Sequence, residues 1–274
     1  MMQKNHQKRF SFEDIQERKN ADTPLVCLTS YTAPMTKILD PHCDILLVGD
    51  SLGMVVYGME NTLGVTLDMM INHGKAVVNA SKNAFILIDM PYGTYEEGPE
   101  QAYISAKRIM NETSCQAVKL EGGAHMKKTI ELLTERNIPV MAHIGLKPQS
   151  VVREGGYKVK GKTDQEISEL LTDAKEVEKA GAFAILIEGT VEHASSKITS
   201  SVNIPTIGIG ASPTCDGQVL VTDDMLGIIT EHTPKFVKQY ADLAHEIDEA
   251  ASQYAKDVKN RSFPGKDHVY KGKA

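Results

Sequence analysis

The sequence predicts a single (β/α)8 TIM barrel, in which eight parallel strands form a closed ring and helices connect them. Three observations lead to this prediction. Short runs rich in Val, Ile and Leu recur along the chain, stretches of helical periodicity separate them, and the 274 residues are close to the ~250 typical of this fold. Near-continuous apolar runs suit strands that are buried on both faces. A doubly wound open sheet is the main alternative, because it alternates the same elements.

The predicted strands are the apolar runs themselves. In chain order they are LVCLTSY (25–31), DILLVGD (44–50), AFILIDMP (84–91), AVKLEG (117–122), IPVMAHIG (138–145), AFAILIEG (182–189), IPTIGIGA (204–211) and GQVLVTDD (217–224). The last run gives the weakest strand signal. Counting it yields the eight strands that a closed barrel of this type needs.

Helices are predicted between these strands. Residues 164–181 place their apolar side chains on one stripe, at the spacing of a helix that covers a core. The members of this stripe are Ile167, Leu170, Leu171, Ala174 and Val177. Gly181 then fits a helix C-cap directly before the next strand. Residues 128–137 are interpreted in the same way.

Two further helices are predicted outside the alternating pattern, and we expect them to cap or extend the barrel. One covers about residues 11–20 and the other about residues 234–259. Because no low-complexity linker and no shift in composition divides the chain, residues 1–274 are predicted to form one domain.

Composition excludes several classes of partner. A formal charge of −6 and a pI of about 5.9 argue against nucleic acid or an anionic membrane. Four cysteines lie far apart with no Cys-x-x-Cys pair, which fits reduced thiols better than a zinc site or a disulfide framework. The N-terminus lacks the apolar core of a secretory signal, and no window approaches the roughly 18 apolar residues of a membrane span. We therefore expect a cytoplasmic protein.

Acidic residues stand at the ends of four predicted strands. They are Asp50, Asp89, Glu121 and Glu188, and His143 lies near the end of a fifth strand. In a barrel these strand ends meet at one rim, where the active sites of this fold lie. Each residue alone also fits a helix cap, a turn, an ion pair or a hydrogen-bonded core position. Together the set favours a functional site.

The residue types at these positions indicate metal-assisted chemistry on an anionic substrate. Lys119 lies two residues before Glu121, so both side chains share one face of the strand. Carboxylates without neighbouring cysteines or paired histidines suit Mg²⁺ better than zinc. A 2-oxo acid can chelate such an ion, which would stabilise the enolate formed when a base removes the proton beside the carbonyl. Glu188 is the candidate base.

Longer motifs carry a specific resemblance. They are LTSYTAPMTKILD, LLVGDSLGMVVYG, ILIDMPYGTY, AVKLEGG, AHIGLKPQSV, GGYKVKGKT, ILIEG, IPTIGIGAS and CDGQVLVTDDMLG. In this order, and from about residue 10 to the tail, the chain resembles the ketopantoate hydroxymethyltransferase family. The resemblance implies a (β/α)8 enzyme that moves a hydroxymethyl group from 5,10-methylenetetrahydrofolate to 3-methyl-2-oxobutanoate, giving 2-dehydropantoate for pantothenate and coenzyme A biosynthesis. It also implies a homo-oligomer, usually a decamer built from pentameric rings.

The same resemblance assigns roles to individual residues. It implies Asp50 and Asp89 as ligands of Mg²⁺, with Glu121 as the third acidic residue of the metal site. The positions that hold the 2-oxo acid match Asp50, Ser51, Asp89 and Lys119. Glu188 matches the general base, and His143 lies in a motif near the site with its role left open. Ser212 stands where the family commonly has a glycine, and the segment after Glu188 lacks a proline often found there.

Two rival interpretations remain. Residues 156–163, GYKVKGKT, fit the P-loop pattern of nucleotide-binding proteins. However, no apolar strand precedes them, and Thr163 with Glu166 fits a helix capping box. We interpret the segment as a basic loop near the barrel rim that shapes the entrance or helps to receive an anionic cosubstrate tail. The other rival is a carbon–carbon lyase or mutase of the phosphoenolpyruvate mutase and isocitrate lyase type, whose K-K-C-G-H-type cysteine loop is missing here.

Overall fold

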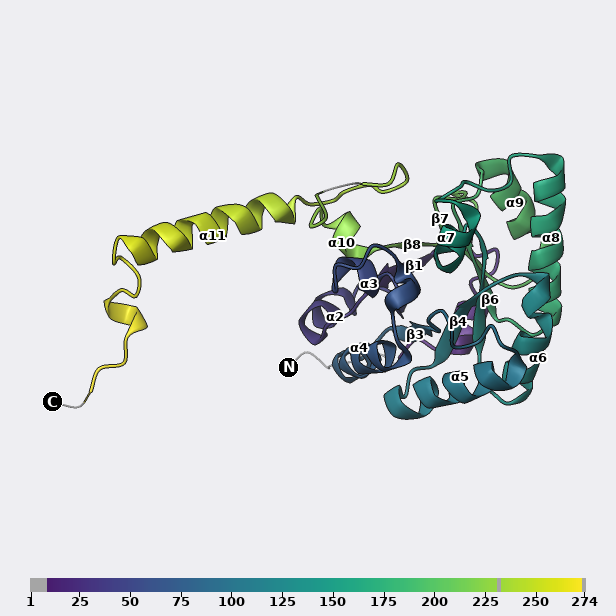
Figure 1. Ribbon diagram of the computed structural model, residues 1–274, viewed down its shortest axis with the longest axis horizontal. Helices are drawn as coiled ribbons and strands as arrows, with labels where there is room; N and C mark the ends of the chain where they lie inside the picture. Colours follow the sequence, from purple (N-terminus) through teal and green to yellow (C-terminus); the bar gives the residue numbers. More distant parts are fainter. Residues whose placement is uncertain (1–8, 231–232, 273–274) are drawn as a thin grey trace. The chain divides into compact units, whose positions relative to one another are not determined.

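The computed structural model describes residues 9–230 and 233–272 and confirms the (β/α)8 barrel (Figure 1). Neighbouring strands pair in parallel around the ring, and β8 closes it by pairing with β1. The strands are β1 Leu25–Thr29, β2 Ile45–Val48, β3 Phe85–Asp89, β4 Ala117–Glu121, β5 Val140–Gly145, β6 Ala184–Glu188, β7 Thr206–Ile209 and β8 Gly217–Leu220. Each strand lies within its predicted run. Because β8 pairs with β1 and closes the ring, the open-sheet alternative is wrong.

Helices cover the outside of the ring of strands (Figure 1). The α-helices are α1 Phe12–Gln16, α2 Ala33–Leu39, α3 Leu52–Val55, α4 Leu67–Ala80, α5 Pro99–Thr113, α6 Lys127–Glu135, α7 Val151–Glu154, α8 Asp164–Lys179, α9 Glu192–Ser201, α10 Thr222–Met225 and α11 Leu243–Lys259. Short 3-10 helices are η1 Thr62–Gly64, η2 Ala124–Met126, η3 Pro148–Ser150 and η4 Lys266–His268. None of the helices in the described ranges combines the length and apolarity needed to cross a membrane.

Strand periodicity separates two cores. In β3, Phe85 and Leu87 belong to the cluster inside the barrel, whereas Ile86 and Ile88 belong to the cluster between the strands and the outer helices. Successive side chains of a strand point to opposite faces, so every second residue enters the barrel. The next inward position after Leu87 is Asp89. The same alternation therefore determines which polar side chains reach the barrel interior at the strand ends.

The N-terminal segment closes one end of the barrel, as expected. Ile15 of α1 is fully buried in the interior cluster, and the ring of Phe12 lies 5.4 Å from that of Phe183, just before β6. The helix ends at Gln16 and is therefore shorter than the predicted range of about residues 11–20. The next residues form turns, and Asn20 has a positive φ while its N–H donates to Asp216.

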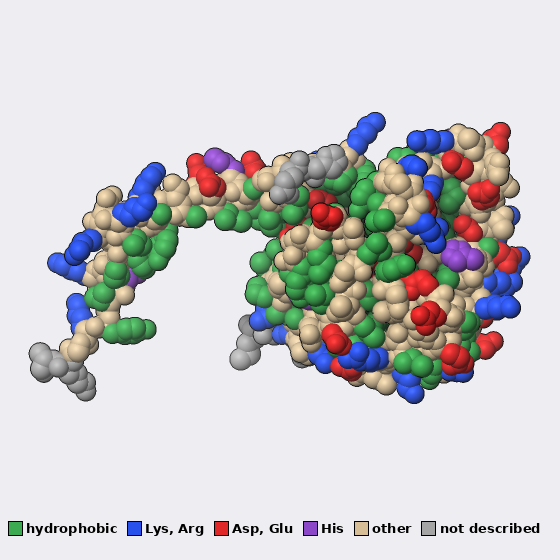
Figure 2. Space-filling view, in the orientation of Figure 1, with side chains coloured by type: hydrophobic (Ala, Val, Ile, Leu, Met, Phe, Trp, Pro, Cys, Tyr) green, Lys and Arg blue, Asp and Glu red, His purple; other side chains and the backbone are tan. Residues whose placement is uncertain are grey.

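The chain forms two compact units, one comprising residues 1–222 with the barrel and the other residues 223–274. In the second unit, α11 begins at Leu243 rather than near residue 234. The preceding residues do not continue the helix, because the N–H groups of Tyr240 and Leu243 donate to Met225 and Leu226. All 17 residues of α11 are at least partly exposed, and hydrophobic side chains follow one side of it (Figure 2).

Candidate active site

The structure brings the predicted polar residues together at the C-terminal ends of the strands. Asp89, Glu121 and Glu188 are the last residues of β3, β4 and β6. Strand pairing places Lys119 opposite Asp89, and His143 opposite Glu121. Asp50 follows β2, and its N–H donates to Asp89 Oδ2 at 3.0 Å. We call the set of Asp50, Asp89, Lys119, Glu121, His143 and Glu188 the mouth cluster.

A buried ion pair lies at the centre of the mouth cluster. Lys119 Nζ lies 2.8 Å from Asp89 Oδ1, and both side chains are almost fully buried. Burial by itself would lower the pKa of Lys119, but the carboxylates of Asp89, Asp50 and Glu121 raise it above its usual value. The ammonium therefore stays charged and offsets the repulsion between carboxylates that the fold holds close together.

The carboxylates around this ion pair are hard to ionise. Burial, and then the charge of Asp89, raise the pKa of Asp50 to about 6, although Lys119 opposes this shift. Burial and Asp50 likewise raise the pKa of Glu121 well above its usual value. Such shifts at converging buried groups are typical of functional sites. A cation or a cationic substrate group in the cluster would relieve this repulsion.

Glu188 and His143 form the other side of the cluster. His143 Nε2 lies 3.4 Å from Glu188 Oε2, and His143 Nδ1 lies 3.5 Å from Lys119 Nζ. Burial raises the pKa of Glu188 to about 8, with Asp50 and Asp89 adding to the shift and Lys119 opposing it. The Glu188 side chain keeps 19% of its surface exposed, so this carboxylate is accessible to a small molecule while its neighbours are buried.

Ser51 directly follows Asp50 of the mouth cluster, and its side chain does not cap a helix. It precedes α3, yet its side chain makes no capping hydrogen bond. Its Oγ instead lies 2.8 Å from the hydroxyl of Tyr31, a buried residue that follows β1. Either hydroxyl can be the donor in this hydrogen bond, and when Tyr31 donates, the Ser51 proton is available to a bound anion.

Two neutral residues of the site were not predicted from the sequence. Gln149 of η3 donates from its side chain to Asp50 Oδ2 at 2.8 Å and from its backbone N–H to both carboxylate oxygens of Glu121 at 3.2 Å. Tyr95, in the loop after β3, donates to the Gln149 side chain. Both lie inside the motifs quoted above. The sequence argument selected charged residues at strand ends, and these two side chains are uncharged and lie in loops.

A glycine allows β5 and β6 to approach each other at the site. Gly145 ends β5 opposite Glu188 and has a φ of +91°. A Cβ at this position would collide with the carbonyl oxygen of Glu188. Glycine is therefore required next to the candidate base, both for its backbone angle and for space.

The P-loop pattern lies in a different structural context from that of nucleotide-binding proteins. Residues 156–163 follow α7, whereas a P-loop follows a buried strand. Thr163 caps α8 by accepting from the N–H of Glu166, as the sequence predicted, and Glu166 accepts from the N–H of Lys162. The hydroxyl and the backbone at the end of the motif thus stabilise a helix terminus.

Ser212 and the segment after Glu188 also have structural partners. Ser212 is buried and donates to Glu192 at the start of α9. Thr190, two residues after Glu188, donates to the Glu188 carbonyl. The two differences from the family pattern therefore stabilise loops beside the site.

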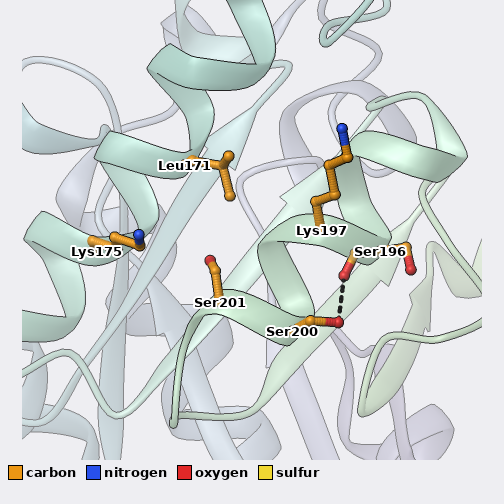
Figure 3. Close-up of a pocket in the computed structure, with 6 residues that line it drawn as sticks. All are labelled: Leu171, Lys175, Ser196, Lys197, Ser200 and Ser201. Atoms are coloured by element: carbon orange, nitrogen blue, oxygen red, sulfur yellow. Dashed lines mark hydrogen bonds between the residues drawn. The ribbon is translucent and has the colours of Figure 1, made fainter. Parts of the chain in front are cut away.

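A separate hollow lies on the outer helices, away from the mouth cluster. It has a volume of about 340 Å³ and lies between α8 and α9 (Figure 3). Its lining residues are Leu171, Lys175, Ser196, Lys197, Ser200 and Ser201. Ser200 donates to the carbonyl of Ser196 within α9. The hollow contains no acid or base pair comparable to Glu188 and His143, so we do not assign the chemistry to it.

Comparison with known proteins identifies the family of this chain. The family model described as ketopantoate hydroxymethyltransferase matches residues 9–266. The 3-methyl-2-oxobutanoate hydroxymethyltransferase of Paramagnetospirillum magneticum is 56% identical over 263 residues, covering 96% of each chain. That of Brucella suis is 53% identical over 266 residues, covering 97% of this chain and 96% of the relative.

Solved structures add agreement on the fold. The phosphoenolpyruvate phosphomutase of Streptomyces platensis matches with a TM-score of 0.60 over 95% of this chain and 92% of its own, at 12% identity. At that identity the match bears on the fold alone. The sequence relatives, in contrast, are more than half identical along nearly their whole lengths. The chain therefore belongs to the ketopantoate hydroxymethyltransferase family of enzymes.

Proposed function

We propose that this enzyme takes the one-carbon unit of 5,10-methylenetetrahydrofolate and transfers it to C3 of 3-methyl-2-oxobutanoate. The C3–H bond breaks, a C3–carbon bond forms, water supplies the hydroxyl group, and tetrahydrofolate and 2-dehydropantoate leave. The observation that carries this proposal is the mouth cluster, in which His143 lies between the partly exposed Glu188 side chain and the buried Lys119–Asp89 ion pair. A base and a cationic anchor on one rim are what proton removal beside a carbonyl requires.

Lys119 and Ser51 are proposed to hold the oxo acid. The Lys119 ammonium keeps its charge because acidic side chains surround it. An anionic 2-oxo acid would accept hydrogen bonds from the Lys119 ammonium and from the Ser51 hydroxyl. Asp50 and Asp89 lie next to these donors, so the substrate carboxylate is expected to reach them through a shared cation rather than directly.

The donor set fits Mg²⁺. Within the described residues, no three His, Cys, Asp or Glu side chains form a preformed metal cage. Mg²⁺ is usually held by one or two carboxylates, with waters and substrate oxygens completing its octahedron. Asp50 and Asp89 offer such a pair, and Glu121, which shares Gln149 as a partner with Asp50, is proposed to act through water. A bound Mg²⁺ would supply positive charge beside the keto oxygen, where negative charge develops.

Glu188 is proposed as the base that removes the C3 proton. Its raised pKa makes it a stronger base than an ordinary carboxylate, and its exposed fraction leaves it open to the substrate. His143 faces its other side and separates Glu188 from Lys119. An ion pair with the lysine would weaken Glu188 as a base, so this separation supports its role.

The test is a direct assay with 3-methyl-2-oxobutanoate, methylenetetrahydrofolate and Mg²⁺, followed by detection of 2-dehydropantoate. Formation of this product, lost on removal of the folate or of divalent cations with a chelator, is the expected result. Turnover without folate, or cleavage of a carbon–carbon bond in a 2-hydroxy diacid, would instead support the lyase and mutase alternative. Nucleotide binding that is lost in Lys162→Ala would support the P-loop alternative.

We further propose that the enzyme works as a homo-oligomer, in line with the decamer that the resemblance implies. The exposed apolar residues of α11, among them Ile247, Tyr254 and Val258, support this proposal, because contiguous exposed apolar surface is typical of interfaces. Native mass spectrometry of the purified chain tests it, and a monomer at micromolar concentration would contradict it. The four cysteines are free and buried, which supports a reducing cytoplasmic location.

A further inference from the structure

Gln149 connects three strand ends at the mouth of the barrel. Its side-chain Nε2 donates to Asp50 Oδ2 at 2.8 Å and to the carbonyl of Met90 at 3.0 Å. Its backbone N–H donates to both oxygens of Glu121. The residue is only 7% exposed. One buried glutamine thus contacts the segments that follow β2 and β3 and the last residue of β4.

Tyr95 determines which way the Gln149 amide lies. The backbone N–H of Glu121 donates to the Tyr95 hydroxyl at 3.2 Å, so the hydroxyl's own proton is available for Gln149 Oε1, to which it is hydrogen-bonded. The Met90 carbonyl can only accept. An amide rotated by 180° would therefore lose the donor from Tyr95 and direct its oxygen at the oxygens of Met90 and Asp50. These hydrogen bonds therefore allow only one orientation of the Gln149 amide, in which its N–H group donates to Asp50.

A neutral donor suits a carboxylate that must bind a cation. Buried Asp50 needs a hydrogen bond to offset its desolvation. A lysine or arginine at position 149 would satisfy Asp50 but would also cancel the negative charge that attracts a divalent ion. An amide satisfies one oxygen, restricts rotation of the carboxylate, and keeps the full charge. Groups that orient a metal ligand in this way typically change metal affinity by roughly 10–100-fold when they are removed.

We propose that Tyr95 and Gln149 form a positioning pair that fixes the Asp50 carboxylate beside Asp89 and thereby sets the affinity of the site for its divalent cation. The proposal rests on the metal role proposed above for Asp50. Gln149 acts through Asp50 and does not itself contact the reacting atoms. The Glu121 contact comes from the backbone, so changes to the Gln149 side chain leave that donor in place and remove the donors to Asp50 and to the Met90 carbonyl.

The test compares full-length Gln149→Met and Tyr95→Phe with the wild type. Mn²⁺ binding is measured by electron paramagnetic resonance in the presence of 3-methyl-2-oxobutanoate. Gln149→Met keeps the side-chain length but removes the donor, and we expect its Mn²⁺ affinity to fall by roughly 10–100-fold. Tyr95→Phe is expected to weaken binding in the same direction by a smaller factor. Tyr95 also accepts from the Glu121 N–H, so the shared route through Gln149 is tested by non-additivity. The double variant should weaken Mn²⁺ binding by less than the product of the two single effects.

Gln116→Met is the matched control. Gln116 accepts from the Ile86 N–H near the opposite end of β3, so its loss affects the fold without affecting the mouth cluster. We expect it to lower thermal stability while leaving Mn²⁺ affinity unchanged. Steady-state kinetics give a second readout. In Gln149→Met the Mg²⁺ concentration for half-maximal rate should rise, while kcat at saturating Mg²⁺ stays within a few-fold of wild type.

Different failures have different meanings. A folded Gln149→Met variant with wild-type Mn²⁺ affinity would overturn the positioning pair, as would equal effects of Gln149→Met and Gln116→Met on affinity. If Gln149→Met does not fold, wild-type affinity in Tyr95→Phe would overturn it. If the wild-type enzyme binds no Mn²⁺ with the oxo acid present, the metal role of Asp50 itself is wrong, and the pair loses its proposed purpose.

Discussion

His143 lies between a lysine and a glutamate, with Nδ1 at 3.5 Å from Lys119 Nζ and Nε2 at 3.4 Å from Glu188 Oε2. An ammonium can only donate, so Nδ1 accepts, and the proton of a neutral ring is then on Nε2. Burial, followed by repulsion from Lys119, lowers the pKa of His143 well below its usual value. The imidazole is therefore neutral and of one tautomer, although it lies among charged groups.

The first prediction concerns this tautomer. We expect His143 to remain neutral from pH 5 to pH 8, with Nε2 protonated and Nδ1 bare. Nitrogen-15 NMR of histidine-labelled enzyme measures both properties, and a His143→Gln variant assigns the signal. A His143 signal that changes its chemical shift between pH 5 and pH 8 would contradict the prediction.

The second prediction is the pH dependence of proton removal. Glu188 acts as a base only when ionised, and its pKa is raised to about 8. Exchange of the C3 proton of 3-methyl-2-oxobutanoate for deuterium should therefore rise with pH, with a midpoint near 8, and should be about 100-fold below its plateau two pH units lower. Proton NMR in heavy water follows this exchange. A rate independent of pH between 6 and 9 would exclude Glu188 with this pKa as the base.

A third prediction separates the base from substrate binding. Glu188→Gln keeps the size of the side chain but removes the group that accepts the proton. Exchange of the C3 proton should fall by roughly 10²–10⁴-fold, while calorimetry should show 3-methyl-2-oxobutanoate binding within a few-fold of wild type. Glu135→Gln, an exposed change at the end of α6, is the control and should leave both measurements unchanged. Normal exchange in Glu188→Gln would mean that another group is the base.

The fourth prediction concerns the proposed metal ligands. Asp50→Asn and Asp89→Asn each remove one of the two negative charges that we assign to the cation. Calorimetry should show that Mg²⁺ no longer strengthens binding of 3-methyl-2-oxobutanoate in either variant. Asp68→Asn is the control, since Asp68 is an exposed carboxylate paired with Arg108. Unchanged Mg²⁺ dependence in both Asp50→Asn and Asp89→Asn would contradict the assignment.

The strand ends of the site were predictable from the sequence because of strand periodicity. An acidic residue two positions after an inward apolar residue, as with Leu87 and Asp89, must also point into the barrel. Closure of the barrel then brings such positions together. Periodicity and closure together therefore account for Asp89, Glu121 and Glu188. Asp50 follows outward-facing Val48 by two positions, so it was predicted from its place at a strand end and reaches the site through the turn after β2. The structure confirms that these strand ends converge.

Residues held by loops could not be predicted in this way. Gln149 reaches Asp50 across 99 positions of sequence, and no local pattern encodes the path of the loop between β5 and α8. The start of α11 was also misjudged, because residues before Leu243 favour a helix by composition yet donate their N–H groups to the chain near Met225. Both features depend on tertiary hydrogen bonds, which outweigh local preference.

The fifth prediction tests how much the N-terminal segment contributes to the barrel. Ile15 is fully buried in the interior cluster, so Ile15→Ala would leave a cavity among residues that cannot easily close it. We expect a loss of about 2–5 kcal/mol in the free energy of unfolding, measured by urea denaturation. Ile38→Ala on α2 removes the same atoms from a side chain that is 65% exposed, and it should cost within about 0.5 kcal/mol. Equal losses in the two variants would mean that the segment does not support the barrel interior.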